Sequence, residues 1–202
     1  MQLDLGHCGV RSFRDADAAP IARHANNRKV WVQLRDQFPH PYTTDNAHGF
    51  IRFTLAQDRE TAFAITVDDL PVGAIGVVLR DDVERCSAEI GYWLGEEYWG
   101  RGIATSALAG LTRFAFTAYD LERLYALPLA SNAASCRVLE KAGYRLEGRL
   151  RRSAIKDGVV QDQLLYAILR EEAGVGTAGR ETGAPTRAPA GPTSGGGDAD
   201  AR

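Results

Sequence analysis

The stretch Trp99-Gly-Arg-Gly-Ile-Ala-Thr105 constrains this chain more than any other part of its sequence. It follows an apolar run of strand formers from Ile90 to Leu94, and the apolar residues after it recur at helical spacing. The pattern predicts a strand, a tight loop and a helix. The first turn of a helix has amide groups without intrahelical acceptors, and glycines beside it let a phosphate approach the backbone.

Two familiar phosphate loops do not fit this stretch. A Walker loop requires Lys-Ser or Lys-Thr after its second glycine, where Ile103-Ala104 stand here. The dinucleotide fingerprint requires a third glycine that is missing. Taken alone, the Gly-x-Gly triplet is also compatible with a plain structural turn, so the rest of the chain has to decide.

A second stretch, Asn132 to Gly148, supplies that evidence. Trp99-Gly-Arg-Gly-Ile-Ala104 resembles the pyrophosphate loop [Gln/Arg]-x-x-Gly-x-[Gly/Ala] of the Gcn5-related N-acetyltransferase (GNAT) superfamily, departing from it at the first position. The second stretch is similar to the same family's Asn-x-x-Ser-x-x-Val-Leu-Glu-Lys-x-Gly-[Phe/Tyr]-x-x-Glu-Gly. Trp-Gly-x-Gly-x-Ala-Thr is typical of the RimJ/RimL-type branch, which acetylates ribosomal-protein N-termini. The resemblance covers roughly Val10 to Glu172.

The order of elements agrees with that fold. A helix joins the strand ending at Leu94 to the next strand, so these two strands must be parallel. We therefore expect an α/β (α+β) fold of the GNAT type, with a mixed central sheet splayed between two parallel strands and flanked by helices. The expected strands are 10–13, 61–67, 71–80, 87–94, 123–129, 144–152 and 161–169, and the expected helices 16–26, 29–35, 45–57, 103–119 and 132–141.

A length of 202 residues suits one domain. We place a GNAT N-acetyltransferase domain at residues 1–172. Residues 173–202 are rich in Gly, Ala, Pro and Thr and poor in large apolar side chains, so we predict a disordered tail.

Charge and cysteine usage give no sign of several partner classes. The formal net charge of −2 gives no reason to expect nucleic acid or a membrane as partner, and neither a membrane span nor a signal peptide is visible. Cys8, Cys86 and Cys136 are far apart and form no zinc pattern. We expect a cytoplasmic protein without a metal. The oligomeric state stays open, with a homodimer as one option.

The resemblance implies a site for acetyl-CoA as co-substrate. The family binds pantetheine in the gap between the two parallel strands, here beside Trp93 and Leu94, and Asn132 reaches the pantetheine arm. The pyrophosphate is expected on the loop residues Arg101, Gly102, Ile103, Ala104 and Thr105.

The reaction that the family catalyses is attack of a neutral amine on the thioester, and it requires a base because an α-amino group is largely protonated near pH 7. Glu89, at the start of the strand beside the thioester, is our candidate base; the alternative is a solvated carboxylate at a strand end. Many relatives carry, seven residues after Asn132, a tyrosine that serves as the acid of the reaction. Leu139 stands at that position here. Ser135 matches a serine near the sulfur and is our candidate hydrogen-bond donor.

The leading hypothesis is an N-acetyltransferase acting on a primary amine, with a protein N-terminal α-amine as the favoured acceptor. A small-molecule acceptor, an aminoglycoside or a polyamine, is the first alternative. It would need several acids at the cleft, and Glu96 and Glu97 alone are few. The second alternative is a non-catalytic acyl-CoA-binding module, which only Leu139 supports.

Overall fold

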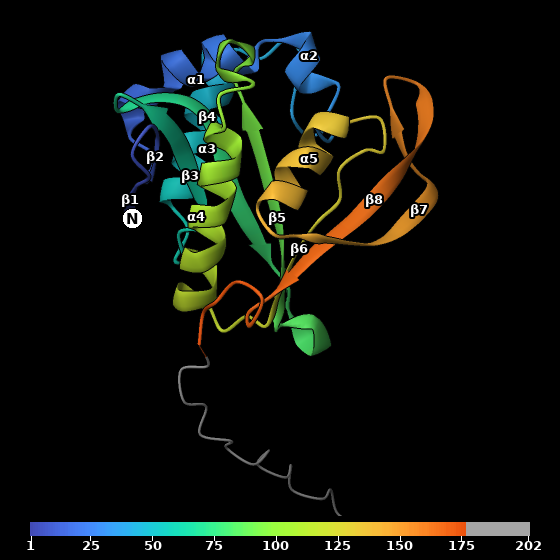
Figure 1. The fold of residues 1–202 in the computed structure, drawn as a ribbon. Coiled ribbons are helices and arrows are strands. Elements are labelled where there is room, and N and C mark those ends of the chain that lie inside the picture. Colours follow the sequence, from blue (N-terminus) through green and yellow to red (C-terminus); the bar gives the residue numbers. More distant parts are fainter. Residues whose placement is uncertain (177–202) are drawn as a thin grey trace, which may run out of the picture.

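One mixed eight-stranded sheet runs through the computed structural model, which describes residues 1–176 (Figure 1). The order across the sheet is β1-β2-β3-β4-β5-β6-β8-β7. The strands are β1 Gln2–Asp4, β2 Gly9–Arg11, β3 Ala62–Val67, β4 Leu70–Leu79, β5 Ser87–Leu94, β6 Arg123–Ala126, β7 Arg145–Lys156 and β8 Val159–Leu169; the α-helices are α1 Ala18–Ala25, α2 Arg28–Trp31, α3 Thr44–Leu55, α4 Ile103–Ala118 and α5 Ala133–Lys141.

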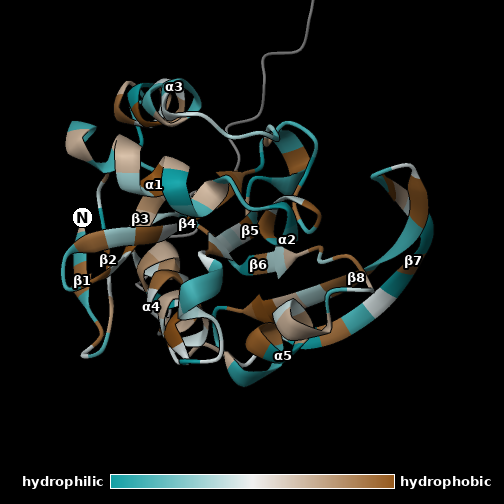
Figure 2. Ribbon diagram, turned by 90° about the horizontal axis from the view of Figure 1, so that it is seen from above, coloured by the Kyte–Doolittle hydropathy of each residue, from teal (hydrophilic) through white to brown (hydrophobic). Residues whose placement is uncertain are grey.

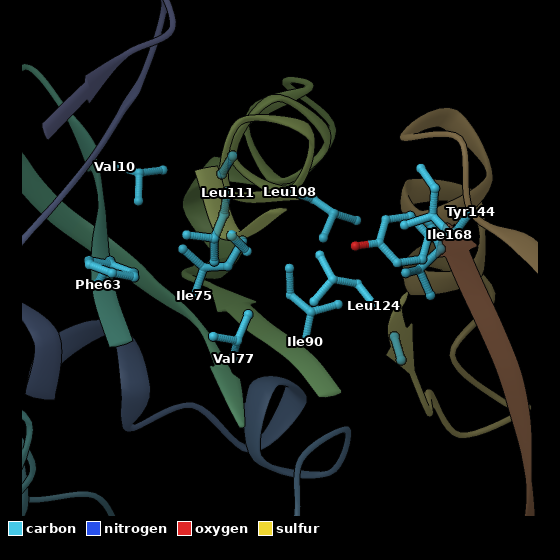
Figure 3. Packing of buried hydrophobic residues seen from close by; sticks show 14 of the residues in the cluster. Val10, Phe63, Ile75, Val77, Ile90, Leu108, Leu111, Leu124, Tyr144 and Ile168 are labelled. Carbon is cyan, nitrogen blue, oxygen red and sulfur yellow. The ribbon is translucent and has the colours of Figure 1, made fainter. Parts of the chain in front are cut away.

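Helices cover both faces of this sheet. Figure 2 shows α1 and α3 on one side and α4 and α5 on the other. The larger core lies under α4, where Leu108 packs with Ile90 of β5 and Leu124 of β6 (Figure 3). A smaller core joins α1 and α3 to the opposite face through Ile21 and Ile51. Burial of these apolar faces holds the sheet and the helices in fixed positions.

β5 and β6 form the parallel pair that the sequence predicts. They pair over three residues, ending with Glu89 opposite Tyr125, and then diverge. All other neighbouring strands are antiparallel. The predicted fold class is confirmed: the sheet is mixed, it opens between its two parallel strands, and helices flank it.

Several boundaries differ from the predicted ones. The first α-helix begins at Ala18 because the preceding carboxylate, Asp17, accepts hydrogen bonds from the Arg11 guanidinium at 2.7 and 2.9 Å and from the Arg14 amide at 2.8 Å. The final hairpin is longer than expected because Asp157 and Gly158 form a tight turn with φ of 52° and 74°. Strand β1 was not predicted.

The end of the described chain lies against the domain. Ala173 and Val175 pack against the larger core, so ordered structure continues past the predicted boundary at residue 172. Residues 177–202, which make up most of the predicted tail, lie outside the described residues, and their disorder stays a prediction.

Candidate active site

The gap between β5 and β6 exposes backbone groups of β5. The amide of Arg80 donates to the Ser87 carbonyl at 3.1 Å, and the amide of Gly95 donates to the Val72 carbonyl at 2.8 Å. Hydrogen-bonded positions alternate along an antiparallel pair, so the odd-numbered residues of β5, Trp93 among them, direct their backbone groups to β4. The amides of Tyr92 and Leu94 therefore point to the open side.

The glycine loop ends β5 and begins α4. Gly100 and Gly102 have φ of 75° and 78°, in the left-handed region that glycine adopts without a steric penalty. Gly102 is the N-cap of α4, and no described side chain caps that helix. A Cβ atom at Gly100 would have no neighbour within 4 Å, and one at Gly102 would meet only the His7 imidazole at 4.0 Å. This helix end is open enough for a phosphate group.

The side chains around the loop have separate tasks. Ile103 is buried in the larger core, so only its backbone amide is available to a ligand. Arg101 lies with its guanidinium 5.2 Å from the ring centroid of Tyr98. The Trp99 indole donates to the Leu94 carbonyl at 2.7 Å and so ties the loop to the end of β5. The sequence analysis missed this last contact.

The first turn of α5 faces the same gap. Asn132 is the N-cap of α5, and its Oδ1 accepts a hydrogen bond from the Ser135 amide at 3.0 Å. With Oδ1 held by the cap, the Nδ2 group is the donor that the Asn132 side chain offers to a ligand. Leu139 is fully buried in the core, so this position supplies no polar group.

A tyrosine of β5 joins the two sides of the gap. The hydroxyl of Tyr92 lies 2.9 Å from the Ser135 hydroxyl and 3.2 Å from the Ser135 carbonyl oxygen. Burial raises the pKa of Tyr92 to about 12, although the hydrogen bond with Ser135 acts in the other direction. The phenol therefore keeps its proton throughout the physiological range. The sequence analysis did not single out Tyr92.

Glu89 lies on the opposite face of β5 from Tyr92. Its carboxylate forms ion pairs with two arginines, Arg80 at 3.1 Å and Arg35 at close range. Arg80 also donates through Nε to the Tyr125 hydroxyl at 2.7 Å. The Glu89 side chain is only 11% exposed. It is therefore a fixed, mostly buried carboxylate and not a solvated strand end.

Aromatic side chains extend this face of the sheet. Trp93 packs edge to face on Phe38 with ring centroids 5.7 Å apart, and Phe38 packs on Tyr42 at 4.7 Å. Phe38 and Tyr42 belong to the segment Phe-Pro-His-Pro-Tyr-Thr, which lies between α2 and α3. Its contact with Trp93 places it on the same face as Glu89.

The tip of the β7–β8 hairpin contacts α2 and the segment that follows it. Asp157 forms an ion pair with Arg28 of α2. Lys156, 3% exposed, lies 2.8 Å from the Asp36 carboxylate and 3.7 Å from the ring centroid of Trp31. In Figure 1 the hairpin curves up toward α2 at the end of the molecule where the glycine loop also lies.

Comparison with known proteins agrees with this geometry. The acetyltransferase (GNAT) domain family matches residues 8–145. The chain belongs to this family. The putative ribosomal N-acetyltransferase YdaF of Bacillus subtilis is 35% identical over 100 residues, which are 50% of this chain and 54% of that protein. Mycobacterium smegmatis RimJ in complex with CoA-disulfide is 32% identical, has a TM-score of 0.74, and is covered over 84% of its length by 83% of this chain.

GNAT relatives with another acceptor are also similar to this chain. Spermidine N(1)-acetyltransferase of Escherichia coli is 25% identical over 169 residues, which are 81% of this chain and 86% of that protein. The chain spans about half to two thirds of the length of the first curated relatives that it matches, 54% and 66%.

Two further features of this GNAT domain concern metals and membranes. Within residues 1–176, no three or more His, Cys, Asp or Glu side chains gather as they would around a metal ion. In the same range, no helix combines the length and apolar character needed to cross a membrane. The expectations that the protein needs no metal and has no nucleic-acid or membrane partner stay predictions.

Proposed function

We propose that this GNAT protein transfers the acetyl group of acetyl-CoA to a primary amine, and that the acceptor is a protein N-terminal α-amine. The observation that supports it most is the uncapped, glycine-lined start of α4, directly after the strand whose amides face the gap between β5 and β6. An anion site and a row of free amides at the same place suit the pyrophosphate and the amide-containing arm of coenzyme A.

The residues of the loop and the gap have distinct roles in this proposal. The amides from Arg101 to Thr105 hold the pyrophosphate, and the Leu94 and Tyr92 amides pair with the pantetheine arm, to which Asn132 donates through Nδ2. The backbone groups of Trp93, by contrast, point to β4. Its side chain lies on the face of β5 that carries Glu89, which we call the acceptor side because the amine is proposed to bind there. Acetyl-CoA supplies an activated thioester when bound.

Glu89 is the proposed acceptor of the amine proton, directly or through water. It is the last residue of β5 that pairs with β6, and two guanidiniums hold both of its oxygens in place. A carboxylate fixed at this point orients an incoming amine and receives the proton that the amine must lose.

Charges on the acceptor side favour a singly charged amine over a polycation. Arg35 and Arg80 outnumber the Glu89 carboxylate that they contact. Glu96 and Glu97, the acids that a polycation would need, are engaged by Lys29 and Arg23. Similarity to RimJ and to a putative ribosomal N-acetyltransferase points the same way. Spermidine is the second candidate acceptor because a spermidine acetyltransferase aligns over 81% of the chain.

A location in the cytoplasm is also part of the proposal, and the oligomeric state stays open, with a homodimer as one option. Cys8, Cys86 and Cys136 are all free thiols, as is usual in a reducing compartment.

A steady-state assay with the purified full chain tests the acceptor. We expect acetyl transfer to a short peptide with a free Ser or Ala N-terminus and no transfer to the same peptide with a blocked N-terminus. Faster transfer to spermidine would overturn the acceptor class. Binding of acetyl-CoA without transfer to any amine would instead support the acyl-CoA-binding module.

A further inference from the structure

The Tyr92–Ser135 contact spans the gap in which the proposed function places the thioester. Tyr92 lies on β5, three residues beyond the last residue paired with β6, and Ser135 lies in the first turn of α5. Their hydroxyl oxygens are 2.9 Å apart. No step in the function proposed above uses Tyr92 as a side chain.

We propose that Tyr92 is a positioning residue: its hydroxyl donates to Ser135 Oγ and thereby directs the Ser135 hydroxyl hydrogen toward the thioester sulfur. This inference rests on the proposed function, because it needs coenzyme A in the gap between β5 and β6.

The number of hydrogens limits the arrangements of this pair. Tyr92 has one hydroxyl hydrogen and two acceptors within reach, Ser135 Oγ at 2.9 Å and the Ser135 carbonyl at 3.2 Å. If Tyr92 donates to Oγ, the serine's own hydrogen is free to point into the gap. If Tyr92 donates to the carbonyl, the 2.9 Å contact is a hydrogen bond only when the serine donates its hydrogen to the phenol oxygen. Only the first arrangement leaves a donor for the sulfur.

The transfer reaction can be balanced without a proton from Ser135. When the carbon–sulfur bond breaks, its electron pair stays on sulfur, and the Ser135 hydroxyl stabilises that charge by a hydrogen bond. The amine proton goes to Glu89 or to water, and the thiolate takes its proton from water. Position 139 of α5 is a buried leucine and therefore supplies no phenol. The phenol beside Ser135 is that of Tyr92 on β5 instead.

Coenzyme A binding gives a readout that is independent of turnover. A thiol has a pKa near 8.5, so a donor at the sulfur makes the bound thiolate more stable and the affinity rise with pH. We compare coenzyme A with its desulfo analogue by calorimetry between pH 7 and pH 9.5. The wild type should gain about tenfold in relative affinity for coenzyme A over this range, because each unit of pKa shift is a factor of ten.

Tyr144→Phe is the matched control for Tyr92→Phe. Tyr144 is also buried, and its hydroxyl also pairs with a hydroxyl, that of Thr112 on α4 at 2.8 Å, and not with Ser135. Tyr92→Phe should abolish the pH-dependent gain, and Tyr144→Phe should keep it. Equal gains in both variants would overturn the inference.

The turnover rates should also show that Tyr92 and Ser135 act as one unit. Tyr92→Phe and Ser135→Ala should each lower kcat about 10- to 100-fold, the range for loss of a hydrogen bond to a charged group, with little change in the KM for acetyl-CoA. The double variant should be no slower than Ser135→Ala, because both changes remove one donor. Additive losses would contradict the inference. A wild-type protein that does not bind coenzyme A would overturn the proposed function and this inference with it.

Discussion

Gly102 combines two requirements that only glycine meets at the start of α4. Its φ of 78° strains any residue with a Cβ atom, and the space beside it is where the proposed pyrophosphate lies. Gly158, in the hairpin turn, has nearly the same φ of 74° and also faces open space, but it is far from the phosphate site in the chain. The two glycines therefore separate backbone strain from ligand contact.

Gly102→Val should weaken acetyl-CoA binding by at least about 10-fold, since the side chain would occupy phosphate space and disturb the helix start. Both substitutions place a Cβ atom at a positive φ, at a strain cost of roughly 1–2 kcal/mol each, so Gly158→Val should lower Tm about as much as Gly102→Val does. Gly158→Val should leave the affinity for acetyl-CoA unchanged. Calorimetry on both folded variants measures the difference. Unchanged affinity in Gly102→Val would remove the phosphate site from the account.

Glu89 is the other residue whose role the contacts define. Glu89→Gln should lower kcat/KM by about 10²-fold at pH 7, the usual scale for loss of a general base. The deficit should shrink toward pH 9, because an α-amine with a pKa near 8 is then already neutral. Glu147→Gln is the control, since Glu147 also pairs with an arginine, Arg123, on the exposed face of β7. Near-normal rates for Glu89→Gln from pH 7 to pH 9 would assign the proton to water or to another group.

At the scale of elements, the segment after α2 connects the two halves of the acceptor side. Its neighbouring residues Arg35 and Asp36 reach Glu89 of β5 and Lys156 of β7 respectively. Lys156 lies over Trp31 of α2 as well, so the hairpin tip, α2 and β5 are held in one arrangement. Because these contacts surround Glu89, they should define how the acceptor enters.

Lys156→Met tests this connection. Methionine keeps the unbranched stem against Trp31 and removes the charge, which costs about 0.5–2 kcal/mol of cation–π attraction. We expect a several-fold higher KM for a peptide acceptor and an unchanged affinity for acetyl-CoA. Arg145→Met, at the other end of β7 with its partner Glu172, should change neither value. A KM unaffected by Lys156→Met would show that the hairpin tip does not shape acceptor entry.

Local signals explain which elements the sequence predicted well. The bounds Ser87–Leu94 for β5 and the end of α5 at Lys141 follow from strand formers and from the glycine after the helix, both contained in a few consecutive residues. The parallel pairing of β5 and β6 follows from the helix between them. Strand β1 was missed because three residues without clear alternation pair only with the edge strand β2.

The sequence could not predict which side chains contact each other, for a physical reason. Arg35 lies 54 positions from Glu89, and Tyr92 lies 43 positions from Ser135. No local pattern specifies which residues the folded sheet brings together across such separations. The resemblance predicted a backbone site in the glycine loop, and that site stays a proposal, whereas the arginines around Glu89 and the phenol beside Ser135 emerged only from the fold.

At the scale of the whole molecule, one sheet carries on its opposite faces the two groups of residues that we propose as half-sites. The start of α4 and the Tyr92–Ser135 pair lie on the face of the larger core, and Glu89 with Arg35 and the aromatic segment lies on the other. The gap between β5 and β6 is the passage between them. In the proposed function, the acyl donor and the amine therefore approach from different faces of the sheet.

A competition experiment tests the central claim most directly. The full chain is given acetyl-CoA, spermidine and a peptide that contains both a free N-terminal α-amine and an internal lysine, and mass spectrometry locates the acetyl group. The account predicts acetylation of the peptide α-amine at least about tenfold faster than of spermidine or of the lysine. Acetyl groups found mainly on spermidine or on the lysine would contradict it.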